Sequence, residues 1–150
     1  MSALTLAAAS RIVDAALEHG HSLKLAPLTV VVLDAGGVLV AAKREDNSSL
    51  LRPEIATGKA YGALALGFGS RELARRAANA PAFMNALSDL AGGKMVPVPG
   101  GVLIRADDPA GVGAVIGAVG ISGDVSDKDE ACAVAGIRAA GLRPDTGDPA

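Results

Sequence analysis

The chain has 150 residues and a formal net charge of −2, and half of it is hydrophobic although it holds only two Phe, one Tyr and no Trp. This length fits one domain, 1–150, with a core large enough to fold alone. A near-neutral charge disfavours a nucleic-acid partner, which needs a basic patch, and 20% charged residues are too few for a disordered chain. The single cysteine, Cys132, excludes an internal disulfide and a CxxC metal site, and its alanine neighbours indicate a small buried hydrophobe.

No segment reads as a membrane span or a targeting signal. Arg11 and Asp14 interrupt the apolar N-terminal stretch before a secretory signal could form. The longest uncharged run, 109–123, is shorter than the ~20 residues that a spanning helix needs, and glycines interrupt it. We therefore expect a cytoplasmic protein without a membrane partner.

The first part of the chain is expected to fold as a helix followed by a β-hairpin. Apolar residues at helical spacing predict a helix over 4–19, with Gly20 as its C-cap. The β-branched run 28–33 predicts a buried strand. The segment Asp34-Ala-Gly-Gly37 has the composition of a hairpin turn, so 38–43 is expected to return as a second strand.

Three helices are expected next. The first, over 53–66, begins at a proline, whose missing N–H costs nothing in the first turn. The second, over 70–79, is expected to take Ser70 as its N-cap. The third, over 81–91, again begins at a proline.

Three β-rich segments follow, over 95–98, 101–105 and 112–121. A last helix is expected over 126–140. Ser126 is the expected N-cap of that helix, and 142–150 is interpreted as a loose tail. The order α-ββ-ααα-βββ-α predicts a single α+β domain with a central antiparallel sheet of about five strands and about five flanking helices.

Lys59 is the first candidate for chemistry, because it lies between Gly58 and Ala60 on a predicted helix. Burial among small residues lowers the pKa of a lysine, which can then act as a base or as a Schiff-base nucleophile. The alternative is a side chain that extends to solvent. In an enzyme, Asp34 or Arg44 would orient Lys59.

Glycines at predicted strand ends are the second candidate. Gly100 and Gly101, and likewise Ser122 and Gly123, place backbone N–H groups where they can hold an anion or a developing oxyanion. Turn formation alone is the alternative. The glycine-rich stretch 112–120 lies inside a strand pattern and is interpreted as close packing or a bulge, because neither a Rossmann context nor a P-loop is present.

The two histidines and the few aromatic residues are the third candidate. His19 and His21 do not share a helix face, which disfavours a structural zinc site, but one of them could be an axial ligand of haem iron. The alternative is a cation at the helix end or a solvated loop. Every aromatic residue, together with a methionine, lies in the central helical region, where they suit either a flat apolar ligand or core packing; these residues are Tyr61, Phe68, Phe83 and Met84.

Five segments together resemble the GlcG/HbpS-like family of small haem-binding or haem-degrading-type domains, which also form the C-terminal domain of some corrinoid adenosyltransferases. They run through nearly the whole chain and cover 31–42, 59–60, 98–104, 117–123 and 129–137. The resemblance implies an α/β sandwich-like domain that assembles into homo-oligomers and has a pocket for haem or another small ligand. It places family positions at Asp34, Lys59-Ala60, Pro99-Gly100-Gly101 and Asp129-Glu130.

Two functions are therefore expected. The first is a small-ligand-binding protein, with haem as the candidate cofactor, that acts as an oligomeric accessory or sensor protein. Its ligand would contact the aromatic cluster and one of the two histidines. The second is a small cofactor-independent enzyme that acts on a hydroxy-, oxo- or related carboxylic acid, with Lys59 as base or amine.

Overall fold

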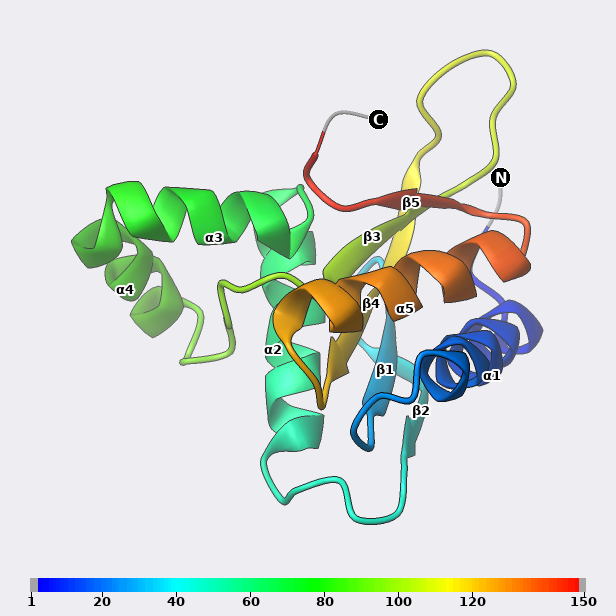
Figure 1. Cartoon of the computed structure of the whole chain (residues 1–150). Coiled ribbons are helices and arrows are strands. Elements are labelled where there is room, and N and C mark those ends of the chain that lie inside the picture. The colour runs from blue at the N-terminus through cyan, green and yellow to red at the C-terminus, as the bar shows by residue number, and fades with distance from the viewer. Residues whose placement is uncertain (1–2, 149–150) are drawn as a thin grey trace.

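An antiparallel five-stranded sheet in the order β2-β1-β4-β3-β5 organises the computed structural model, which describes residues 3–148 (Figure 1). The strands are β1 (Thr29–Asp34), β2 (Leu39–Arg44), β3 (Gly101–Arg105), β4 (Val115–Ser122) and β5 (Arg143–Asp145). The helices are α1 (Leu6–Ser22), α2 (Arg52–Leu66), α3 (Ser70–Asn79), α4 (Pro81–Leu90) and α5 (Ser126–Ala139). The predicted α+β class with five helices and five antiparallel strands is confirmed.

Strand β1 is buried on both faces, which explains its continuous apolar sequence. Successive side chains of a strand point to opposite faces. Val30 and Val32 belong to the core that the sheet shares with α1 and α5, which lie side by side in front of it in Figure 1. Val31 and Leu33 pack with alanines of α2 in a second core on the opposite face.

Helix α2 lies unusually close to the sheet because glycines replace side chains beneath it. A Cβ atom at Gly120 would lie 1.8 Å from the carbonyl oxygen of Ala56, and one at Gly101 would lie 2.1 Å from that of Lys59. The two glycines are direct partners in the β3–β4 ladder. For Gly120, this contact confirms close packing, one of the two roles expected for the glycine-rich stretch 112–120.

Helices α3 and α4 form an arm that extends to one side of the sheet (Figure 1). A small separate core of Leu73, Met84 and Met95 holds the arm together. Gly67 ends α2 in the left-handed conformation, with φ of 85°. The arm thus carries its own apolar side chains away from the main core.

Two predicted segments differ from the structure. The segment 95–98 is not a strand, because the N–H of Val96 donates to the carbonyl of Gly58 and the carbonyl of Val98 accepts from Ser70. The fifth strand is instead β5, at residues that were expected to form a loose tail. It pairs with β3, and Arg105 holds the Asp145 carboxylate at 2.9 Å.

The predicted helix caps also need correction. Helix α1 continues past Gly20, which is buried where a Cβ would meet Leu28 at 2.7 Å, so this glycine serves packing and not capping. Ser70 and Ser126 are the first residues of their helices, and neither helix has a side-chain cap. The Ser70 hydroxyl bridges two other groups, described below.

Cys132 is buried in the main core, as the sequence indicates, and burial raises the pKa of its thiol to about 11. No helix within residues 3–148 combines the length and apolar character that crossing a membrane requires.

Gly120→Ala is expected to lower the free energy of unfolding by about 3 kcal/mol or more, because the new methyl group must push α2 off the sheet. Gly111→Ala is the matched control: no atom lies within 4 Å of its added Cβ. The control should change stability by less than about 0.5 kcal/mol. Urea unfolding of both variants measures the difference, and equal midpoints would contradict the close contact.

Candidate functional site

Lys59 of α2 forms a buried ion pair with Asp129 of α5. Its side chain is 3% exposed, and its Nζ donates to Asp129 Oδ2 at 3.1 Å and to the carbonyl of Ile121 at 2.8 Å. The two helices cover opposite faces of the sheet, so the pair passes beside the end of β4 and joins the two helical layers. The predicted alternative, a lysine that extends to solvent, is wrong.

Burial dominates the ionisation of this pair. It lowers the pKa of Lys59 and raises that of Asp129, while their mutual attraction opposes both shifts. The positive charge of Arg52 lowers the pKa of Lys59 further. A carbonyl substrate would have to displace Asp129 or the Ile121 carbonyl to reach Nζ, so the use of Lys59 as base or amine stays a prediction.

The structure does not bring the two expected orienting residues to Lys59. Asp34 lies in the β1–β2 turn, where its Oδ1 accepts from the N–H groups of Gly36 and Val38. Arg44 lies on edge strand β2, and its Nη1 donates to the carbonyl of Ser48 at 3.4 Å. The charged side chains that act on Lys59 are instead Asp129 and Arg52.

Arg52 and the strand-end residues surround this end of the sheet. Arg52 Nη1 donates to the Ser122 hydroxyl at 3.0 Å. Arg52 precedes Lys59 by two turns of α2, and this spacing in the sequence already indicates that both side chains lie on the same face of the helix. The N–H of Gly101 donates to the Ser70 hydroxyl at 2.7 Å, and a Cβ at Gly100 would lie 2.9 Å from Lys59 Nζ.

Gly123 packs against the segment before β1, where a Cβ would meet the carbonyl of Pro27 at 2.3 Å. The Gly101 amide and the Ser122 hydroxyl are thus both engaged inside the protein. Anion binding by these strand ends stays a prediction.

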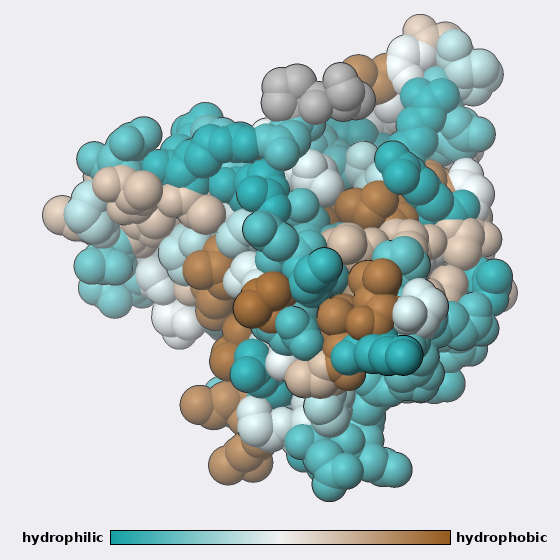
Figure 2. Space-filling view, in the orientation of Figure 1, coloured by the Kyte–Doolittle hydropathy of each residue, from teal (hydrophilic) through white to brown (hydrophobic). Residues whose placement is uncertain are grey.

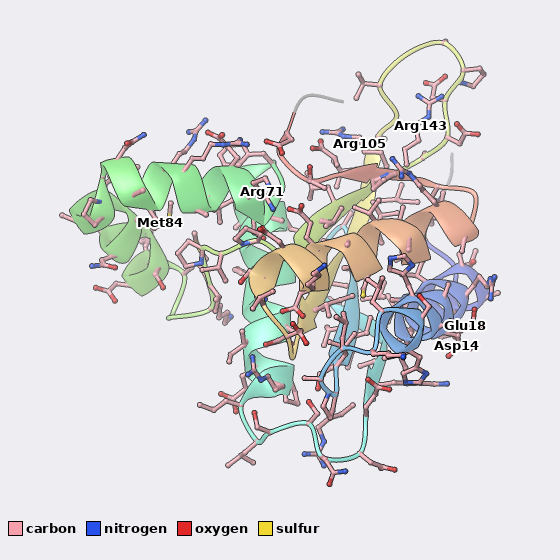
Figure 3. The ribbon with its side chains drawn as sticks, viewed as in Figure 1. Asp14, Glu18, Arg71, Met84, Arg105 and Arg143 are labelled. Carbon is pink, nitrogen blue, oxygen red and sulfur yellow. The ribbon has the colours of Figure 1, made fainter. Side chains whose placement is uncertain are left out.

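Three of the four predicted aromatic-cluster residues line one pocket of ≈ 400 Å³ between α3, α4 and the end of α2. These are Phe68, Phe83 and Met84, and Figure 3 shows Met84 between the two helices of the arm. Tyr61 does not line this pocket: it packs against the small core of the arm and beside Gly37, and Lys94 Nζ lies 5.5 Å from the centre of its ring.

His21 lies at the other side of the molecule, at the end of α1, in a cleft of ≈ 460 Å³. Its Nε2 is hydrogen-bonded to Glu45 Oε2, and Glu45 Oε1 accepts from the N–H of Leu28 at 2.8 Å. Apolar side chains, two cations and a second carboxylate complete the lining, namely Leu17, Leu25, Pro27, Lys43, Arg44 and Asp46. His19 is half-buried and does not line this cleft.

The single pocket expected from the sequence, with aromatic walls and a histidine ligand, is therefore not formed within one chain. The α1 end and the α3–α4 arm lie on opposite sides in Figure 1. The two halves of the predicted site are two separate hollows of different chemistry.

A network of hydrogen bonds connects the His21 cleft with the buried ion pair. Asp129 Oδ1 accepts from the N–H of Asp124 at 3.0 Å, and Asp124 Oδ2 accepts from the N–H of Ala26 at 2.8 Å. The N–H of Ala26, and after it that of Val125, donate to the Asp124 carboxylate and hold its pKa below the usual value. The loop that carries Leu25 and Pro27 is thus tied to the centre of the fold.

The residues of the His21 cleft fit haem chemically. A haem site needs an axial donor for iron, an apolar wall for the macrocycle and cations for the propionates. His21 supplies an imidazole, the leucines and proline supply the wall, and Lys43 and Arg44 supply positive charge. Glu45 would act as the carboxylate behind a ligating histidine, which orients such rings in metal sites.

The family model described as haem degrading protein HbpS-like matches residues 4–138. The chain therefore belongs to the HbpS-like family, which confirms the resemblance. A search of curated proteins found no match.

Solved structures with the same fold include haem-related proteins. The PduOC:heme complex superposes with a TM-score of 0.81 at 28% identity, covering 94% of this chain and 97% of that one. A double mutant of Streptomyces reticuli HbpS has a TM-score of 0.77 at 29% identity, covering 92% and 87%. The Klebsiella pneumoniae protein ORFY, at 23% identity and a TM-score of 0.80, covers 94% and 92% and shares the fold.

Removing one partner of the buried pair should destabilise the protein strongly. Asp129→Leu leaves the Lys59 ammonium buried without a counter-charge, and Lys59→Met leaves the Asp129 carboxylate in the same position. Each substitution should lower the free energy of unfolding by about 3–5 kcal/mol. The double variant should recover much of this loss, because no unpaired charge remains. Urea unfolding of the four proteins measures the coupling, and strictly additive losses would show that the pair is not the contact that matters.

Proposed function

We propose that this protein binds haem and that the His21 cleft receives it. The observation that carries the proposal is the combination, in one cleft, of an imidazole, an apolar wall and two cations. Family membership supports it, as does the likeness to PduOC, a protein that was crystallised as a haem complex. When bound, the haem would supply an iron centre and a visible chromophore.

Glu45 determines which ring nitrogen of His21 is available. A carboxylate accepts the proton of the nitrogen that it contacts, and this nitrogen is Nε2. Nδ1 is then the ring atom with a free lone pair, and the negative charge of Glu45 makes it a stronger donor. The bond from Leu28 N–H to Glu45 fixes the carboxylate in place.

The two cations of the cleft differ in how readily they can bind a propionate. Lys43 Nζ donates to Asp14 of α1 at 2.8 Å, so it would have to share or exchange that partner; Figure 3 labels Asp14 on this helix. Arg44 has only the 3.4 Å contact with a carbonyl, and no carboxylate within residues 3–148 pairs with it. We infer that Arg44 is the main propionate partner.

Titration with haemin is expected to shift the Soret band of the wild-type protein at micromolar concentration. His21→Ala should weaken binding by more than about tenfold, because it removes the donor, and Arg44→Gln should weaken it by a smaller factor. His19→Ala is the matched control, because His19 is a histidine of the same helix that lies outside the cleft. This variant should bind haemin with the affinity of the wild-type protein. An unchanged wild-type spectrum, or a loss with His19→Ala alone, would contradict the proposal.

We also propose that the protein acts as a homo-oligomeric accessory or sensor protein. Apolar side chains at the start of α2 support self-association: Leu50 is 84% exposed and Leu51 57%, and Figure 2 shows apolar surface at that end of the molecule. Light scattering after size-exclusion chromatography should give a multiple of 14.8 kDa, reduced by Leu50→Asp. A monomer mass at every concentration would contradict the oligomer.

A further inference from the structure

The pocket in the α3–α4 arm has a different chemistry from the His21 cleft. It holds two of the three aromatic side chains of the protein, and its volume of ≈ 400 Å³ lies in the range of small-molecule sites. Its walls are mostly apolar, with an arginine and an asparagine as the polar groups. The lining residues are Leu66, Phe68, Arg76, Asn79, Ala80, Phe83, Met84 and Leu87.

The floor of this pocket is fixed, whereas its mouth exposes an aromatic ring. Met84 is 3% exposed and packs with Leu73 and Met95 in the small core of the arm. Phe83, the next residue, is 65% exposed. Core packing therefore accounts for Met84 but leaves the position of Phe83 unexplained.

Arg76 gives the pocket a positive charge at a defined place. Its guanidinium lies 4.3 Å from the centre of the Phe68 ring, a cation–π contact that keeps it over the aromatic wall. Nε donates to Glu72 at 2.9 Å, and no hydrogen bond from the two terminal nitrogens is found among residues 3–148. Arginine presents such free donors in a fork that suits a carboxylate or a sulfonate.

We propose that the arm pocket is a second binding site, which takes a small apolar organic anion of the aromatic carboxylate class. The apolar body packs against Phe68, Phe83 and Met84, and the anionic group binds the terminal nitrogens of Arg76. Charge complementarity and the exposed ring at the mouth favour this occupant. The α3–α4 arm and α1 lie at opposite ends of the view in Figure 1, and the arm pocket shares no lining residue with the His21 cleft, so binding there does not depend on haem.

The test uses 8-anilinonaphthalene-1-sulfonate, a flat apolar anion that fluoresces when bound, with 1-naphthoate as the competitor. Arg76→Gln should weaken binding of the dye by about fivefold, because it removes the charged donors. Phe83→Ala should also weaken it, and 1-naphthoate should displace the dye from the wild-type protein. His21→Ala should leave dye affinity unchanged, which separates this site from the haem site.

Arg75→Gln is the matched control for charge. Arg75 is the neighbouring arginine on α3 and also pairs with Glu72, but it does not line the pocket, so its loss should change affinity by less than about twofold. Equal effects of the two arginine variants would overturn the proposal. A changed elution volume for Phe83→Ala with unchanged dye affinity would overturn it too, because the ring would then cover a contact between copies of the chain.

Discussion

The ion pair between Lys59 and Asp129 is the contact on which the arrangement of the two helical layers depends. Two charges that are almost fully buried are tolerated only as partners, so α2 and α5 must meet beside the end of β4. The approach is possible because Gly100, Gly101 and Gly120 leave no side chain between α2 and the sheet. These glycines let α2 approach the sheet, and that approach brings Lys59 to Asp129.

The His21 cleft is built outward from this pair. Asp129 holds Asp124, and Asp124 holds the loop at Ala26. Glu45 then links that loop, through the N–H of Leu28, to the His21 ring. A histidine at the exposed end of a helix is thereby held by the centre of the fold, and a side chain fixed in advance loses less entropy when it binds a ligand.

Features that depend on local chemistry were predictable from the sequence. The Asp34–Gly37 turn and the range of α3 follow from residues that are neighbours in the chain. Strand β5 was not predictable in this way, because only pairing with β3 makes three residues at the end of the chain a strand. The partners of Lys59 and His21 were equally hidden, since Asp129 and Glu45 lie 70 and 24 positions away. The family resemblance pointed to Asp129 but not to its role, and no local pattern signalled Glu45.

Haem binding at His21 is tested most directly by locating the iron with anomalous X-ray diffraction from crystals of the protein grown with haemin. We predict an iron peak beside the His21 ring, with the propionates toward Arg44. Iron in the α3–α4 arm next to Met84, or an iron-free His21 cleft in crystals that contain bound haem, would contradict this site.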